Sequence, residues 1–282
     1  MDFDNYWAAV DKELAAIPAR PVLDVVPARA TDEATSYTVR LTSTGPYRVF
    51  GHLSIPTGDG PFPALLQTPR YGSVNHVPHP NDRSRYVVFG LMHRGQRLAD
   101  EGFSAAYPGL LTMGIDDPAS YIYRGIAADC LRAAEFLLGL SEVDPARVAV
   151  TGDDLAVLTA ARRPGFTALR VTDLLFYRAM EARLRSTSYP LEELNDHLRA
   201  GSSVQIVDNT LSYFDPTRHA PAVTATSLVA ADDPDWCASL INALPAAGVY
   251  KLTHLDGTDN DFLDAWLAEL SGVRPMSRFV VG

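Results

Sequence analysis

The chain has 282 residues, of which 47% are hydrophobic, and its formal net charge is −10. That length and composition indicate a single domain, residues 1–282, with one large α/β core. The negative charge repels phosphate backbones and anionic lipid, which disfavours nucleic-acid and membrane-surface roles and favours a small-molecule partner. No run of about 18 apolar residues is present and the N-terminus is acidic and amphipathic, so we expect a cytoplasmic protein.

In chain order, two alternating runs at residues 37–43 and 48–56 predict half-buried strands joined by a hairpin turn. Short apolar runs typical of inner parallel strands follow at residues 63–68, 86–92, 147–152, 168–176, 223–230 and 249–254. Helical patterns alternate with them at residues 121–140, 154–163, 234–248 and 260–272. This alternation predicts an open, mostly parallel sheet with helices on both faces. The charged helical insertion at residues 177–218 is expected to form a lid.

Nucleotide-binding signatures are missing from the sequence. No GxGxxG follows the first parallel strand and no GxxxxGK[ST] occurs, so we expect no nucleotide cofactor. The histidines show no spacing typical of a metal site, so we expect no metal either.

The corner "TGDDLAV" (151–157) joins a buried strand to an apolar helix, where many hydrolases carry a GxSxG nucleophile. Its middle residue is Asp154. Three interpretations stay open: a nucleophile that forms an ester, a general base assisted by Asp153, or a pair of carboxylates that cap the helix without chemistry. Burial and the adjacent charges decide between them, and the sequence does not show burial.

Several motifs together resemble a known family. They are "IPARPVLDVVPAR" (17–29), "HRGQ" (93–96), "PGLLTMGIDDPASYIYRG" (108–125), "VDPARVAVTG" (143–152) and "TLSYFD" (210–215). In this order they resemble the acetyl xylan esterase and cephalosporin C deacetylase group, carbohydrate esterase family seven. The resemblance implies an α/β-hydrolase fold, a pocket for small acetate esters and assembly into a homo-oligomer.

The resemblance also locates the family's Ser-Asp-His triad. Its serine falls on Asp154, its aspartate on Ala230 and its histidine on Thr258, so all three residue types are changed. Two further aspartates follow Ala230 closely. The segment that forms the family's oxyanion hole is partly retained. Tyr71 is present, and the backbone amide of Leu155, directly after the elbow, could hold a carbonyl oxygen with it.

Other polar residues have two interpretations each. Arg70 binds a carboxylate or forms a surface salt bridge, and His93, at the C-terminal end of a strand, contacts a ligand or packs. His254 is a core histidine or a base, and Trp236 lines the lid side of the pocket or packs. With Thr258, these residues are the expected substrate contacts.

From this pattern the expected function is elimination of acetate from an acylated small molecule in specialised metabolism. Asp154 would be the base, tuned by Asp153, while the Tyr71 and Leu155 amides and Arg70 hold the oxygen. Two other functions remain open: an aspartyl-nucleophile or residual ester hydrolase (a deacetylase), and a pseudoenzyme that binds without turnover.

Overall fold

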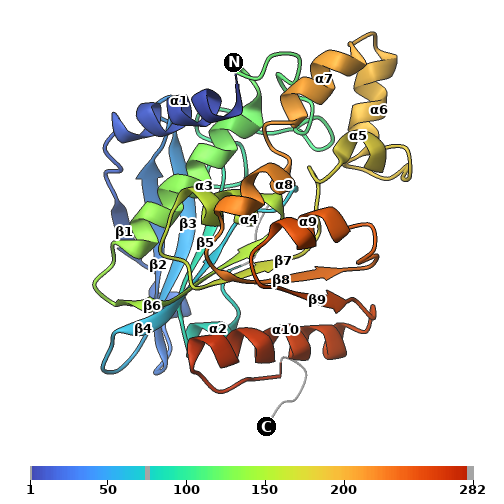
Figure 1. The fold of residues 1–282 in the computed structure, drawn as a ribbon. Coiled ribbons are helices and arrows are strands. Elements are labelled where there is room, and N and C mark those ends of the chain that lie inside the picture. Colours follow the sequence, from blue (N-terminus) through green and yellow to red (C-terminus); the bar gives the residue numbers. More distant parts are fainter. Residues whose placement is uncertain (1, 74–76, 278–282) are drawn as a thin grey trace.

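The computed structural model describes residues 2–73 and 77–277, and these form one mixed sheet covered by helices on both faces (Figure 1). The strands are β1 (Val22–Val25), β2 (Ala34–Thr42), β3 (Arg48–Pro56), β4 (Phe62–Gln67), β5 (Val87–Met92), β6 (Val143–Gly152), β7 (Ala168–Val171), β8 (Thr226–Ala231) and β9 (Ala247–Lys251). Their spatial order is β1-β2-β3-β5-β4-β6-β7-β8-β9. The first three strands and the β3/β5 pair are antiparallel, and every pair from β5 to β9 is parallel.

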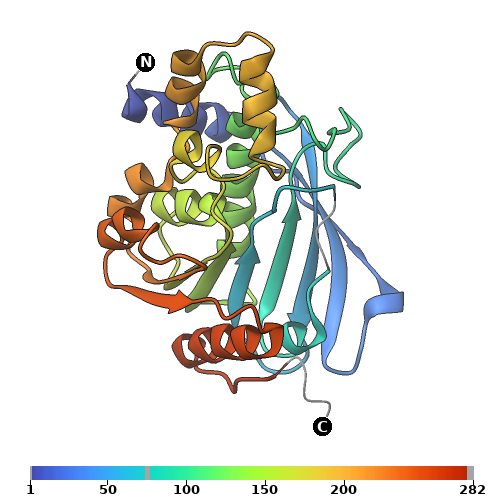
Figure 2. The same ribbon diagram turned by 90° about the vertical axis from the view of Figure 1, so that its right-hand side faces the viewer.

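The helices divide into two layers (Figures 1 and 2). One layer holds α1 (Phe3–Ala15), α3 (Ile122–Leu138), α4 (Asp154–Arg162), α8 (Pro216–His219) and α9 (Ala238–Ala243). The opposite face carries α2 (Pro80–Arg83) and α10 (Asp256–Ser271). Three helices project beyond the sheet: α5 (Ala179–Ala182), α6 (Glu192–Arg199) and α7 (Val204–Leu211). A short 3₁₀ turn, η1 (Pro27–Arg29), follows β1, and a second, η2 (Ala220–Ala222), follows α8.

This architecture confirms the α/β fold predicted from the alternating pattern. The differences lie at element ends and in short elements. The run at 168–176 ends as a strand at Val171, the run at 249–254 ends at Lys251, and β1 and α2 were not predicted. Residues 177–218 contain the short helices α5, α6 and α7 and the start of α8, joined by turns, in keeping with the expected helical character of the insertion. Among the described residues, no helix combines the length and apolar character needed to cross a membrane.

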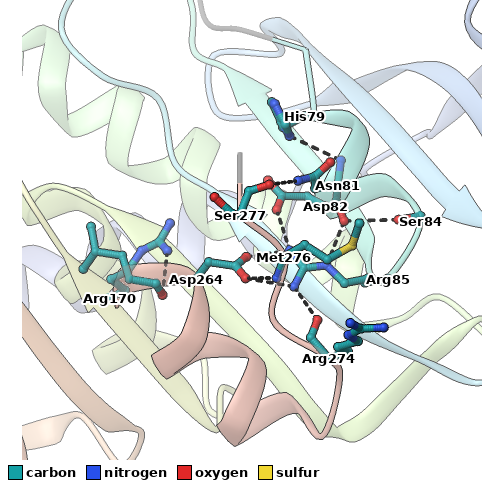
Figure 3. A network of polar contacts seen from close by, with 11 residues as sticks. His79, Asn81, Asp82, Ser84, Arg85, Arg170, Asp264, Arg274, Met276 and Ser277 are labelled. Atoms are coloured by element: carbon teal, nitrogen blue, oxygen red, sulfur yellow. Dashed lines mark hydrogen bonds and ion pairs between the residues drawn. The ribbon is translucent and has the colours of Figure 1, made fainter. Parts of the chain in front are cut away.

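A buried polar network fixes the C-terminal segment beneath the sheet (Figure 3). The Arg85 guanidinium donates to the carboxylates of Asp264 and Asp82 and to the Arg274 carbonyl oxygen, the last at 2.9 Å. The Met276 amide donates to Asp264 at 2.8 Å. Because Arg85 immediately precedes β5, this network lies at the N-terminal edge of the parallel strands, opposite the edge where such sheets bind ligands.

Candidate functional site

A cavity of about 320 Å³ opens where β7 and β8 end, below the inserted helices. Leu174 and Tyr177 follow β7, while Ala230 and Asp232 come from the end of β8. The insertion contributes Ala182, Arg185, Ser186 and Leu191. The C-terminal edge of a parallel sheet is the usual ligand site of this class of fold, so this cavity is the candidate site.

The corner between β6 and α4 is close-packed. A Cβ atom on Gly152 would overlap the hydroxyl of Thr68, so only glycine fits there. Asp153 has extended backbone angles and caps the helix, which begins at Asp154. Neither aspartate has a positive φ. The corner therefore keeps the expected path from strand to helix without backbone strain at the position where hydrolases expose a nucleophile.

Asp154 is 1% exposed and its carboxylate binds the loop after β7. One oxygen accepts the Tyr177 amide at 2.9 Å and the other accepts the Leu175 amide. This explains why the strand expected over 168–176 stops early: residues after Val171 turn their amides toward Asp154 instead of continuing the ladder. Asp154 is not among the residues that line the cavity. This geometry supports the structural interpretation of Asp154 that the sequence left open.

Asp153 is also buried, and its carboxylate accepts the Leu155 amide at 2.9 Å. The amide expected to hold a substrate oxyanion is thus bound to the protein's own carboxylate. Burial raises the pKa of both aspartates, and the neighbouring charge of Asp154 raises that of Asp153 further. Because Asp154 accepts more backbone amides than Asp153, the ionised form is better stabilised at Asp154 and a shared proton belongs on Asp153.

Tyr71 and Arg70 lie near the insertion and the β7 loop. The Tyr71 hydroxyl donates to Glu193 of α6, whose second oxygen accepts the Leu111 amide at 2.9 Å. Arg70 lies 3.1 Å from the Asp173 carboxylate and its side chain is 63% exposed. The Tyr71 side chain therefore anchors the insertion, and Arg70 forms the surface salt bridge that was one of its two interpretations.

Two other expected contacts lie away from the cavity. His93 is 1% exposed, its ring lies 2.6 Å from the Arg94 carbonyl oxygen, and burial lowers its pKa to about 4. Thr258 is exposed in the first turn of α10. Neither is among the cavity-lining residues, so the structure favours packing for His93 and gives Thr258 no substrate contact.

Trp236 lines the cavity, as one interpretation of the sequence expected. Its indole lies between two guanidinium groups, with Arg178 4.1 Å and Arg185 4.2 Å from the ring centroid. Its carbonyl oxygen accepts the Tyr177 hydroxyl at 2.7 Å. These contacts hold the indole as a fixed wall between the insertion and the end of β8.

His254 pairs with an acid at the same edge. Its Nε2 lies 3.4 Å from Oδ1 of Asp232, which lines the cavity, whereas His254 itself is not among the lining residues. The two residues meet because Ala231 of β8 pairs with Lys251 of β9, so the strands end side by side. His254 lies in the loop after β9 and not on the strand, and its side chain is 71% exposed. An exposed histidine beside a carboxylate has the composition of an acid–base pair.

Comparison with known proteins places the chain in a family. The model of the acetyl xylan esterase (AXE1) family matches residues 1–239. The chain belongs to the acetyl xylan esterase family. A curated relative, acetyl esterase Axe7A from Xylanibacter ruminicola, is 24% identical over an alignment of 245 residues that covers 79% of this chain. The chain spans only 54% of that relative's length.

Solved acetyl xylan esterases share the fold. The enzyme from Paenibacillus sp. R4 superposes with a TM-score of 0.80 at 23% identity, covering 97% of this chain and 95% of that one. Acetyl xylan esterase 1 from Thermoanaerobacterium sp. JW/SL YS485 gives 0.80 at 20% identity, covering 95% and 93%. The α/β-hydrolase fold expected from the resemblance is therefore confirmed.

In this member of the acetyl xylan esterase family, the sequence did not predict that Asp232 and His254 contact each other. The sequence comparison set the triad acid on Ala230 and the histidine on Thr258, while Asp232 lies two residues after Ala230 and His254 four residues before Thr258. The available signal was the apolar run ending at Ala231 and followed at once by Asp232. An acid and a histidine, two of the three triad residue types, thus stand at neighbouring strand ends.

Proposed function

We propose that this chain hydrolyses acetate esters of small molecules in the 320 Å³ cavity, with His254 as the general base. The observation that carries the proposal is the 3.4 Å contact of His254 with Asp232, a residue that lines that cavity. Membership of the acetyl xylan esterase family supports ester hydrolysis as the reaction class. Similarity to the acetyl esterase Axe7A supports acetate as the acyl group.

In the proposed reaction Asp232 accepts the Nε2–H of His254, which leaves Nδ1 as the acceptor. His254 takes a proton from water through Nδ1, and the water oxygen forms a bond to the acetyl carbon. The bond from that carbon to the alcohol oxygen then breaks, and the proton on His254 passes to the alcohol. The acetic acid that forms releases its proton to solvent, acetate and the alcohol leave, and no residue of the elbow becomes acylated.

The volume of the cavity limits the size of the substrate. Its volume lies at the low end of the range for small-molecule pockets, roughly 300–1,000 Å³. Trp236 supplies a flat apolar wall and the three cavity aspartates, Asp173, Asp232 and Asp233, supply polar contacts. We therefore propose a substrate of about one ring, such as an acetylated monosaccharide.

Elimination of acetate, the function expected from the sequence, remains a second proposal. The raised pKa of the buried Asp153–Asp154 pair supports it, because a carboxylate with a raised pKa is a stronger base. The contacts of Asp154 with the Leu175 and Tyr177 amides weigh against it, since a base must reach the substrate. The same contacts weigh against an aspartyl nucleophile.

The test is hydrolysis of p-nitrophenyl acetate by the wild type and by His254→Asn. We expect His254→Asn to lower kcat/KM about 100-fold, the usual scale for loss of a general base. His197→Asn is the matched control, because His197 also pairs with an aspartate, Asp116 at 3.1 Å, outside the cavity. That variant should stay near wild type.

Equal rates for wild type and His254→Asn would contradict His254 as the base. Binding of the ester without turnover by the wild type would identify a binding protein and overturn the hydrolase proposal.

A further inference from the structure

A second, much smaller cavity lies among the antiparallel strands and helix α2. It holds about 10 Å³ of solvent-sized space, enough for one water-sized particle. Its polar lining consists of Arg29 after β1, Ser36 on β2, His52 and Ser54 on β3, and Arg83 at the end of α2. The sheet places all five side chains around one cavity, and none of them belongs to the β8 or β9 strand ends.

The lining presents hydrogen-bond donors. Nη1 of Arg29 lies 3.2 Å from Nδ1 of His52, so that nitrogen accepts and Nε2 carries the proton. Nη1 of Arg83 donates to the Arg29 carbonyl oxygen at 2.9 Å and to the Ser36 hydroxyl at 3.3 Å. The Ser36 hydroxyl donates to the Arg29 carbonyl oxygen at 3.2 Å and lies 3.4 Å from the Ser54 hydroxyl. The Nε of Arg83 is buried and has no hydrogen-bond partner.

The two guanidinium groups lack an anionic partner. Within residues 2–73 and 77–277, no carboxylate oxygen lies within 4.0 Å of Arg29 or Arg83. Arg85, two residues further along, differs, because Asp82 and Asp264 neutralise it (Figure 3). His52 carries no charge at neutral pH, because burial and the charge of Arg29 lower its pKa to about 4. It therefore does not neutralise the two arginines. A positive site with an unpaired buried donor in a chain of net charge −10 calls for an external anion.

We propose that this cavity binds one small monovalent anion of the size of chloride. Arg83 and Arg29 would supply the charge, and the Ser54 hydroxyl would supply a further donor, since the Ser36 hydroxyl hydrogen is already given to the Arg29 carbonyl oxygen. The volume favours a single-atom anion, because a tetrahedral oxyanion needs several times that space. The anion would connect η1, β2, β3 and α2, and would stabilise the folded chain by mass action.

The test is thermal unfolding in sodium chloride and in sodium gluconate at equal ionic strength, since gluconate is too large for the cavity. For the wild type we expect chloride to give a saturating rise in Tm of about 2 °C over gluconate. Arg83→Gln should lose this difference. Arg97→Gln, which changes an exposed arginine outside the cavity, should keep it.

Arg29→Gln provides a second variant in case Arg83→Gln does not fold, because Arg29 is exposed. It should also lose the chloride effect. Crystals of the wild type soaked in sodium bromide should show an anomalous peak between Arg83 and Ser36. A chloride effect that is equal in the wild type and Arg29→Gln, or a bromide soak with no peak in the cavity, would overturn the proposal.

Discussion

At the scale of single residues, the elbow aspartates have different tasks. Asp154 holds the loop after β7 through the Leu175 and Tyr177 amides, and Asp153 caps α4 through the Leu155 amide. Sequence alone could place both at a helix start, because Asp is a common capping residue. It could not show that a loop more than twenty residues later turns its amides toward Asp154, since that contact depends on how the loop after β7 folds back.

The raised pKa of Asp153 makes a pH-dependent prediction. Between its unfolded value, about 3.9, and its higher folded value, the folded chain binds more protons, so the free energy of unfolding falls as pH rises through that window. Asp153→Asn removes this fall in the free energy of unfolding, because asparagine does not ionise. The variant keeps an oxygen that can accept the Leu155 amide. We expect the variant to gain at least about 1 kcal/mol over wild type between pH 5 and pH 8, measured by urea unfolding.

Asp235→Asn is the control for that experiment, because Asp235 is exposed and lies outside the elbow. Its stability relative to wild type should not change across the same pH range. A gain for Asp153→Asn that shrinks as pH rises would contradict the assignment of a raised pKa to Asp153.

At the scale of elements, the inserted helices are held to the body by Tyr71 and Glu193. Glu193 is 4% exposed, so its bond from the Tyr71 hydroxyl is shielded from water. The charged helical pattern of the sequence predicted the insertion. From the sequence, Tyr71 was expected to act through its backbone amide, as a donor to a substrate oxygen. The side-chain contact could not be predicted, because it joins residues 122 positions apart.

Tyr71→Phe should loosen the insertion without changing its apolar packing. Loss of a donor to a buried carboxylate costs about 1–3 kcal/mol, so amide exchange in residues 189–200 should quicken at least about fivefold. Hydrogen exchange measured by mass spectrometry tests this. Tyr189→Phe is the control, since its hydroxyl donates to Asp196 on the exposed side of the same insertion. Unchanged exchange in Tyr71→Phe would show that Glu193 does not anchor the helices.

At the scale of the whole molecule, the sequence predicted the fold better than the site. Alternating apolar runs are a local signal, and they identified the inner strands and the mostly parallel sheet correctly. The hydrolase fold was expected from the resemblance to the esterase family. The pairing of Asp232 with His254 is not local, because it depends on the register of β8 against β9. Expected contacts such as His93 and Thr258 were chosen by position along the chain, and burial and helix direction place them elsewhere.

The central claim is that water activated by His254, and not an elbow carboxylate, cleaves an acetate ester. One turnover of tetra-O-acetylxylose in H₂¹⁸O with enzyme in excess tests it most directly. Direct attack by water predicts one ¹⁸O atom in each released acetate and none in the peptide that holds Asp153 and Asp154. Label in that peptide, which an aspartyl nucleophile would produce, or unlabelled acetate, which elimination would produce, would contradict the claim.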